Sequence, residues 1–168
     1  WTDIIQFVPD ANNSTRTAQN SGEQTGYGME FEAVWEATEN FTLTGNLAIQ
    51  NSTDETLDVS AAKSPEKQLY LRADWILPKG WRVNLRGNWV MDRNRLSDDL
   101  RPDIDDYALF DLSARKIFND SLELALTMNN LFDKDAREPS PNSDPMPFIP
   151  NDLPLSGRAV LGEIRYRF

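Results

Sequence analysis

Apolar and polar residues alternate with a period of two along most of this 168-residue chain. In residues 81–92 the odd positions are apolar or Gly, whereas the even positions, apart from Val90, are polar or charged. Residues 41–50 show the same alternation. Because helical spacing would mix the two sets, the pattern predicts strands that have one apolar face and one polar face.

Further segments of the chain have the same period and are predicted to be strands. They are 27–37, 68–77, 122–129 and 160–168, with 106–117 less regular and 1–9 ambiguous. Eight strands are therefore expected. All prolines fall at segment ends or in connections, as the hydrogen bonding of a β-ladder requires.

The predicted connections alternate in length. Short turns are expected around 39–40, 78–80 and 119–120, and long polar connections near 10–15, 52–66, 93–105 and 132–156. Consecutive antiparallel strands place all the short turns at one end of a sheet and all the long connections at the other. This asymmetry is typical of bacterial outer-membrane barrels, which have periplasmic turns and extracellular loops.

Charged residues of both signs occupy the polar face in the middle of the strands. They are Glu30, Glu32, Arg72, Asp74, Arg82, Arg86, Glu123, Glu163 and Arg165. A lipid environment would penalise Arg or Lys at mid-depth by about 2–4 kcal/mol, and acids somewhat less. We therefore expect the polar face to meet water or a protein plug, and the apolar face to meet lipid.

Large aromatic residues lie beside the short turns. These residues are Trp35, Phe41, Trp75 and Trp81, and they predict an aromatic girdle at the inner membrane interface. A strand of about ten residues spans about 33 Å, or roughly 24 Å of height at a 45° tilt, which suits the apolar band of such a barrel. The alternative is a soluble sheet with one solvated face, but soluble sandwiches usually have shorter strands.

Composition narrows the chemistry further. The 27 acidic and 17 basic residues give a net charge of −10, which argues against nucleic-acid binding. The chain has no Cys and no His, which excludes disulfides, thiolate nucleophiles, Ser-His-Asp triads and most zinc chemistry. No stretch approaches the roughly 20 apolar residues of a membrane helix, and the mean hydropathy is −0.57. We find no catalytic constellation and expect no enzyme activity and no cofactor.

Two acidic groups invite a functional interpretation. An acidic run that could bind Ca²⁺ consists of Asp98, Asp99, Asp103, Asp105 and Asp106. This run lacks the Asp-x-Asp-x-Asp-Gly loop with its distal Glu, so a solvated loop is favoured. Glu30 and Glu32 could form a glycosidase pair, but neighbouring same-face carboxylates within a barrel are more often charges of the lumen wall.

Three ordered motifs resemble parts of TonB-dependent outer-membrane receptors. Residues 20–23 and 28–32 resemble the "N-x-G … G-x-E-x-E" strand of this family. Residues 129–134, Asn-Asn-Leu-Phe-Asp-Lys, resemble the "N-L-F-D-K" motif near the end of these receptors, although Ala136 lies near a position where the family often has Tyr. Residues 157–168 resemble the closing strand with its terminal aromatic residue.

The resemblance implies an all-β, antiparallel, up-and-down transmembrane barrel of about 22 strands, plugged by an N-terminal domain. Residues 1–168, which start in mid-pattern at Trp1, would be about eight C-terminal strands, without the plug or the TonB box. In this family the loops and plug bind a scarce nutrient, often a ferric siderophore or cobalamin, and TonB delivers the energy for uptake. The implied location is the outer membrane of a Gram-negative bacterium. The implied partners are outer-membrane lipid, the plug domain, TonB, the barrel-assembly machinery and a small-molecule nutrient.

Within this framework, we predict that five residues of the lumen and long connections contact the ligand. They are Arg86, Asn88, Arg93, Arg95 and Arg101, whose guanidinium and amide groups suit an anionic ligand. On the closing strand, Ile164, Tyr166 and Phe168 are the expected signal for barrel assembly.

Two other functional classes remain open from the sequence. One is a porin or a small eight-stranded outer-membrane barrel, although eight-stranded closure would crowd bulky charges into a narrow interior. The other is a soluble β-sandwich that acts as a binding module or a carbohydrate-active enzyme. An upstream plug domain would distinguish a receptor from the first class, and a requirement for detergent would distinguish it from the second.

Overall fold

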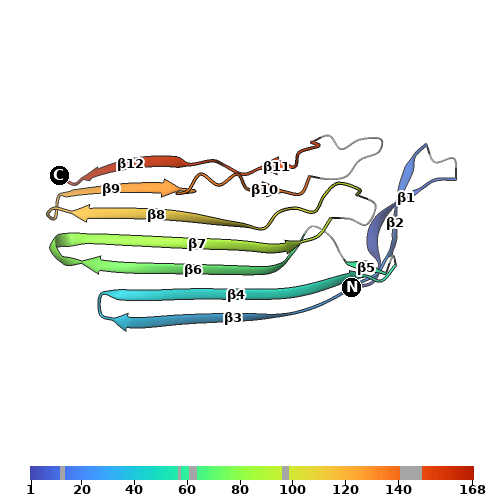
Figure 1. The fold of residues 1–168 in the computed structure, drawn as a ribbon, viewed down its shortest axis with the longest axis horizontal. Coiled ribbons are helices and arrows are strands. Elements are labelled where there is room, and N and C mark those ends of the chain that lie inside the picture. The colour runs from blue at the N-terminus through green and yellow to red at the C-terminus, as the bar shows by residue number, and fades with distance from the viewer. Residues whose placement is uncertain (12–13, 57, 61–63, 96–98, 141–148) are drawn as a thin grey trace.

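A large antiparallel sheet dominates the computed structural model, which describes residues 1–168 except 12–13, 57, 61–63, 96–98 and 141–148 (Figure 1). In spatial order its long strands are β12 (Ala159–Tyr166), β9 (Leu122–Asn129), β8 (Tyr107–Ile117), β7 (Trp81–Arg93), β6 (Pro65–Leu77), β4 (Phe41–Asp54) and β3 (Gln24–Thr38). A two-residue strand, β5 (Val59–Ser60), pairs with β4 and completes the eight-stranded sheet. The sheet is open, with β3 and β12 at its edges.

The register of the strands confirms the two predicted faces. Leu43 on β4 lies opposite Trp35 on one neighbouring strand and Ala73 on the other. Leu85 on β7 lies opposite Ala73 and Leu112. On the other face, Glu32 lies opposite Asn46, and Arg86 lies opposite Asp111. Since the side-chain period is two, this register gathers the apolar residues on one continuous surface.

The apolar surface is not covered by a second layer of protein. Phe31 and Trp35 are 56% and 61% exposed, and the only hydrophobic residues buried among those described are Val90, Tyr107 and Ala136. A β-sandwich would bury one face of the sheet under another sheet, and no such sheet is formed by the described residues. The described residues therefore form a single-layer sheet and not a sandwich, as expected for the wall of a barrel.

The short turns and the long connections lie at opposite ends of the sheet, as predicted (Figure 1). One short turn is the 3₁₀ segment η1 (Pro78–Gly80), in which Lys79 and Gly80 have φ values of 62° and 78°. A side chain at position 80 would also collide with the carbonyl oxygen of Ile117, so this turn requires glycine. In the part of the chain that the structure describes, no helix is long and apolar enough to cross a membrane.

The opening segment differs from the prediction. Residues 1–9 do not join the large sheet: β1 (Ile4–Pro9) pairs with β2 (Arg16–Gly22) in a separate two-stranded sheet at the end with the long connections (Figure 1). The pairs Ile4–Ile5 and Phe7–Val8 break the alternation that a barrel strand needs, and β2 is almost entirely polar. The large sheet therefore contains seven long strands rather than the expected eight.

Candidate functional site

The polar face of the central strands is a network of ion pairs. Arg86 Nε lies 2.8 Å from Asp111 Oδ2, and Arg72 Nε lies 2.8 Å from Asp74 Oδ2. Asn84 donates a second hydrogen bond to Asp74 at 2.8 Å. The register places Asn84 opposite Asp74 and Asp111 opposite Arg86, whereas Arg72 and Asp74 are two positions apart on the same face of β6. The result is a charged wall whose ion pairs are partly exposed to solvent.

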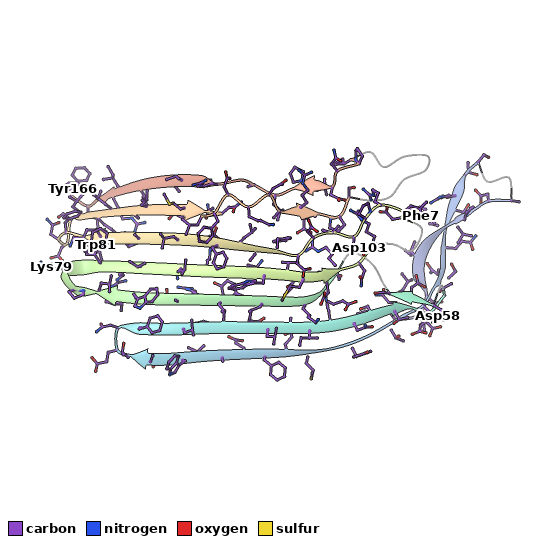
Figure 2. All side chains as sticks on the ribbon, viewed as in Figure 1. Phe7, Asp58, Lys79, Trp81, Asp103 and Tyr166 are labelled. Atoms are coloured by element: carbon purple, nitrogen blue, oxygen red, sulfur yellow. The ribbon has the colours of Figure 1, made fainter. Side chains whose placement is uncertain are left out.

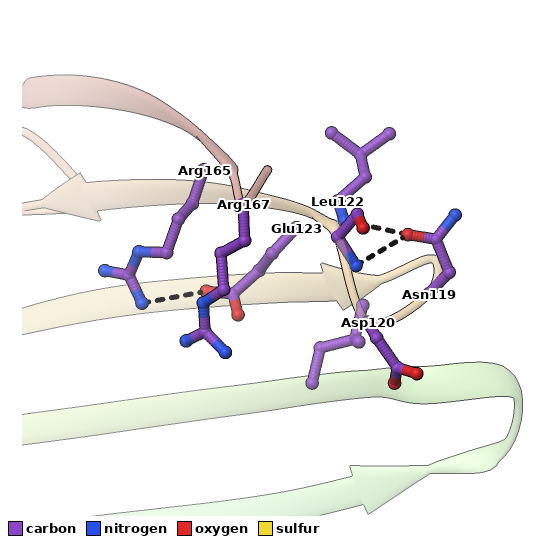
Figure 3. A pocket seen from close by; sticks show the side chains of 8 residues that line it. Asn119, Asp120, Leu122, Glu123, Arg165 and Arg167 are labelled. Atoms are coloured by element: carbon purple, nitrogen blue, oxygen red, sulfur yellow. Dashed lines mark hydrogen bonds and ion pairs between the residues drawn. The ribbon is translucent and has the colours of Figure 1, made fainter.

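A second group of charges surrounds an open hollow of about 500 Å³ beside the turn between β8 and β9 (Figure 3). Glu123 accepts a hydrogen bond from Arg115 and lies 3.5 Å from Arg165, which also pairs with Glu163 at 2.8 Å. Asn119 stabilises the turn, because its Oδ1 accepts hydrogen bonds from the backbone amides of Ser121 and Leu122 at 2.9 and 2.8 Å. An asparagine side chain thus replaces a backbone acceptor in the turn.

Asn130 fixes the base of the long connection between β9 and β12. Its backbone amide donates to Asp111 Oδ1 at 2.7 Å, and its side-chain nitrogen donates to the carbonyls of Lys134 and Ser156 at 2.9 and 3.1 Å. Its Oδ1 accepts from the Lys134 amide at 2.9 Å. Asn130 has a φ of 47°, a conformation that asparagine tolerates better than most residues. These bonds give the Asn-Leu-Phe-Asp-Lys segment a structural role in closing the connection.

Asp133 secures the other side of this base. Its Oδ1 accepts a hydrogen bond from the Arg158 amide at 2.9 Å, and the Arg158 guanidinium lies 3.5 Å from Oδ2. The backbone amide and then the side chain of Arg158 lower the pKa of Asp133. The connection therefore leaves β9 and returns to β12 through a fixed pair of hydrogen-bonded residues.

Farther along this connection, β10 (Arg137–Glu138) pairs with β11 (Leu153–Pro154). Glu138 pairs with Arg93 at the end of β7 and accepts a hydrogen bond from the Tyr107 hydroxyl at 2.7 Å. The Arg93 guanidinium lies 5.6 Å from the centre of the Tyr107 ring, a cation–π distance. Ala136 and Val90 are buried beside this ring. This small core holds the connection against the polar side of the sheet.

A second contact joins the two longest described connections. We call it the loop clamp, and it consists of Arg95, Asp99, Arg101, Ser140 and Asp152. Arg95 Nη2 lies 2.6 Å from Asp152 Oδ2, and Arg101 Nη1 donates to Ser140 Oγ at 2.7 Å. Asp99 pairs with both arginines, at 3.6 Å from Arg95 Nη1 and 2.5 Å from Arg101 Nη2.

The loop clamp is shielded and strongly charged. Its four charged side chains are between 5% and 16% exposed. Hydrogen bonds from Arg101 lower the pKa of Asp99 to about 2, despite the opposing effect of its burial. A hydrogen bond from Arg95 is the main reason why the pKa of Asp152 is also lowered. Both carboxylates therefore stay ionised well below neutral pH.

The structure places the five predicted ligand-contact residues in three different settings. Arg86 and Asn88 lie on the polar face of β7. Arg93 belongs to the Tyr107 core, whereas Arg95 and Arg101 come together in the loop clamp. Apart from Asn88, each residue contacts a carboxylate of the same chain. Their contact with a ligand stays a prediction.

Sequence reasoning missed the partners of these arginines. Arg93 and Glu138 are 45 residues apart, and Arg95 and Asp152 are 57 residues apart. No local pattern signals contacts at such separations, although Asp152 and Glu138 were visible as acids within a long, proline-rich connection. Asp98 of the acidic run lies outside the described residues. Among those described, no three carboxylates are arranged to hold a metal ion.

The predicted girdle residues gather at the end of the sheet with the short turns, where Trp81 is labelled in Figure 2. Phe41 and Trp75 lie opposite each other and stack with ring centres 4.8 Å apart. Lys116 Nζ lies 5.6 Å from the ring centre of Trp81 and 5.4 Å from that of Phe118. Trp35 remains 61% exposed. An aromatic and cationic rim of this kind suits a membrane interface, and the girdle itself stays a prediction.

The three residues of the expected assembly signal end the chain on the apolar face. Ile164 lies opposite Leu124, and Tyr166 lies opposite Leu122. The rings of Tyr166 and Phe168 meet edge to face with centres 5.1 Å apart, at the end of the sheet marked by Tyr166 in Figure 2. Ile164 and Tyr166 are 76% and 59% exposed. Recognition of this end by the assembly machinery stays a prediction.

Comparison with known protein families identifies the family to which this sheet belongs. The sequence profile of the outer membrane protein β-barrel family matches residues 2–147. The chain belongs to the outer membrane protein β-barrel family. This outer membrane β-barrel protein is therefore located in the outer membrane of a Gram-negative bacterium, and its exposed apolar face is the side that meets lipid. No curated protein matches its sequence.

Solved structures confirm the fold of this outer membrane β-barrel protein. The ferripyoverdine receptor of the outer membrane of Pseudomonas aeruginosa matches 98% of the chain with a TM-score of 0.75 and 17% identity. The ferric-catecholate import receptor Fiu from Escherichia coli matches 99% with a TM-score of 0.74 and 18% identity. The copper transporter OprC matches 99% with a TM-score of 0.72 and 19% identity.

The match covers 23%, 24% and 27% of these three proteins, so the chain spans about a quarter of their length. At the level of the fold, these matches confirm the resemblance to TonB-dependent receptors.

Proposed function

We propose that this chain is the C-terminal part of the barrel of a TonB-dependent receptor. The complete receptor would import a scarce nutrient, such as a ferric siderophore or cobalamin, with energy delivered by TonB. The motifs in residues 20–32, 129–134 and 157–168 support this assignment. So do the names of the similar structures, which are receptors for ferric complexes and a copper transporter.

One observation carries the proposal: an open sheet of long strands has a charged, ion-paired polar face and matches receptor barrels over 98–99% of its length. A barrel of about 22 strands encloses a lumen wide enough to need a plug. The paired charges of the polar face, such as Arg86 with Asp111, suit a hydrated contact with such a plug. TonB would engage a part of the receptor outside this chain, and the barrel-assembly machinery would recognise the end formed by Ile164, Tyr166 and Phe168.

The ligand would meet the polar face and the long connections. Arg86 and Asn88 are the proposed contacts on the wall, and the three arginines of the long connections are the proposed contacts at the outer end. Guanidinium groups suit an anionic ligand such as a ferric siderophore. Because Arg95 and Arg101 are held in the loop clamp, their contact with a ligand would require the clamp to open.

Growth under nutrient limitation tests this function. The full-length gene is deleted, and growth is compared with that of the parent strain when iron from single siderophores, cobalamin or copper is limiting. We expect a defect for one nutrient only, restored by the wild-type gene but not in a strain without TonB. A protein that instead admits many small hydrophilic solutes without TonB would be a porin, and the proposal would be wrong.

A further inference from the structure

Four arginines form two like-charge pairs across neighbouring strands on the polar face. Arg72 lies directly opposite Arg86, and Arg82 lies directly opposite Arg115. Cβ atoms of directly opposed residues are about 4.5–5.5 Å apart, and like charges at this separation destabilise a sheet. Such a concentration of positive charge is unexpected in a chain whose net charge is −10.

Three of the four arginines have a carboxylate partner. Arg72 pairs with Asp74, Arg86 pairs with Asp111, and Arg115 pairs with Glu123. Glu123 is shared with Arg165, so it does not fully compensate Arg115. Among the described residues, Arg82 has neither an ion-pair partner nor a hydrogen-bond partner. One positive charge of the group is therefore uncompensated.

Arg82 lies at a hollow of about 440 Å³ whose polar lining consists mostly of hydrogen-bond donors. Its one carboxylate, that of Asp74, already accepts hydrogen bonds from Arg72 and Asn84. The hollow is also lined by Arg115, by Arg72 and by the opposed residues Asn84 and Ser113. Ile76, directly opposite Arg82 on β6, is 52% exposed and adds an apolar border. A guanidinium presents parallel N–H groups that match the two oxygens of a carboxylate or phosphate.

We propose that Arg82 and Arg115, together with the Ser113 hydroxyl, bind an oxyanion at this hollow. The oxyanion is a carboxylate or a phosphate group. Its source is either an acidic side chain from elsewhere in the full-length protein or free inorganic phosphate. The site depends only on the geometry of the sheet, so it stands independently of the proposed transport function.

Whether replacement of Arg82 raises or lowers the unfolding temperature shows whether an anion occupies the site. If no anion binds, replacement of Arg82 removes its repulsion with Arg115, so the protein becomes more stable. If an anion bridges the two arginines, the same replacement removes a charge-assisted contact, so the protein becomes less stable. Arg82→Gln therefore moves the unfolding temperature in opposite directions under the two alternatives.

The experiment measures the thermal unfolding midpoint of the full-length protein in detergent micelles. Wild type, Arg82→Gln and Arg82→Lys are compared in chloride and in inorganic phosphate at equal ionic strength. Arg16→Gln, at an exposed position on the distant β2, is the matched control and should leave the midpoint unchanged. In phosphate we expect Arg82→Gln to lower the midpoint and Arg82→Lys, which keeps the charge but not the planar group, to lower it less. In chloride the same lowering is expected only if the ligand is an acidic side chain of the protein itself.

The phosphate series identifies the source of the anion. If free phosphate is the ligand, it raises the wild-type midpoint. The phosphate concentration that gives half of this increase should then be at least about ten-fold higher for Arg82→Gln than for wild type. If an acidic side chain is the ligand, phosphate has no effect, and Arg82→Gln lowers the midpoint in both buffers.

An Arg82→Gln midpoint equal to or above that of wild type in both buffers would overturn the proposal. If Arg82→Gln does not assemble, the midpoint of Arg82→Lys is used instead. A midpoint equal to that of wild type in both buffers would then overturn the proposal. None of these outcomes depends on nutrient uptake, so failure here is distinct from failure of the proposed function.

Discussion

At the scale of single residues, Asp111 joins the barrel wall to the base of a long connection. One carboxylate oxygen lies 2.8 Å from Arg86 Nε, and the other accepts the backbone amide of Asn130 at 2.7 Å. Asn130 is 4% exposed, so water cannot readily replace this acceptor. The side chain of Asp111 is therefore a structural bridge as well as a charge of the wall.

Replacement of Asp111 by Ala should destabilise the protein by about 1–3 kcal/mol, because it leaves a buried amide without an acceptor. Unfolding of the full-length protein by urea in detergent micelles measures this loss. Glu39→Ala, in an exposed turn, is the control and should change the free energy of unfolding by less than about 0.5 kcal/mol. Equal values for the two variants would show that the bridge contributes nothing.

The sequence located some of these residues but not their contacts. Family resemblance singled out residues 129–134, and the structure shows why Asn130 and Asp133 suit their places, with φ values of 47° and 55°. The acceptor of the Asn130 amide, Asp111, lies on another strand. Periodicity assigns a residue to a face, but it does not say which neighbour its side chain reaches.

At the scale of elements, the loop clamp holds two connections together by ionised carboxylates. The pKa of Asp99 falls from an ordinary value of about 3.9 to about 2 in the folded protein. A lowered pKa means that the ionised form is favoured by folding. The stabilisation is therefore fully present above about pH 4 and is lost as the pH falls towards 2.

Acid should separate the two connections within this range. Spin labels at Leu100 and Asn151, both exposed, report the distance between them. We expect a constant distance from pH 6 to about pH 4 and a longer, broader distribution towards pH 2. Asp99→Asn should give the broad distribution already at pH 6, whereas Asp105→Asn in the same connection should not. A distance independent of both pH and Asp99 would contradict the role of the clamp.

The two faces of one strand should respond differently to the same substitution. Leu47 lies between Phe31 and Leu69 on the apolar face, and its neighbour Asn46 lies opposite Glu32 on the polar face. Leu47→Arg should therefore cost about 2–4 kcal/mol in a bilayer, whereas Asn46→Arg should have little effect. Urea unfolding of the full-length protein in lipid vesicles measures both. Similar costs at the two positions would contradict the assignment of the faces.

The hydrophobic periodicity predicted the long strands of the large sheet but not the hairpin of β1 and β2. The limits of β7 were predicted to within one residue, whereas β4 begins where expected but continues to Asp54, four residues beyond the predicted end. The polar strand β2 was missed, and β1 was assigned to the wrong sheet, because alternation carries no information where both faces of a hairpin are solvated. The loop clamp was missed because its partners are distant in sequence.

At the scale of the whole molecule, the sheet has two surfaces and two ends with different properties. One surface is apolar and exposed, and the other carries ion pairs. One end has short turns and aromatic residues, and the other has the long connections (Figures 1 and 2). The sequence predicted this asymmetry because period and connection length are properties of the chain itself. It did not predict the number of strands in the large sheet, which depends on where β1 pairs.

The central claim is that the apolar face contacts hydrocarbon and the polar face lines the lumen. Spin labels placed singly from 83 to 89 along β7 test it most directly, since this chain has no cysteine of its own. In the full-length protein in lipid vesicles, labels at odd positions such as Leu85 should collide mainly with oxygen, and labels at even positions such as Asn88 mainly with a water-soluble nickel complex. The opposite phase, or no alternation, would contradict the account.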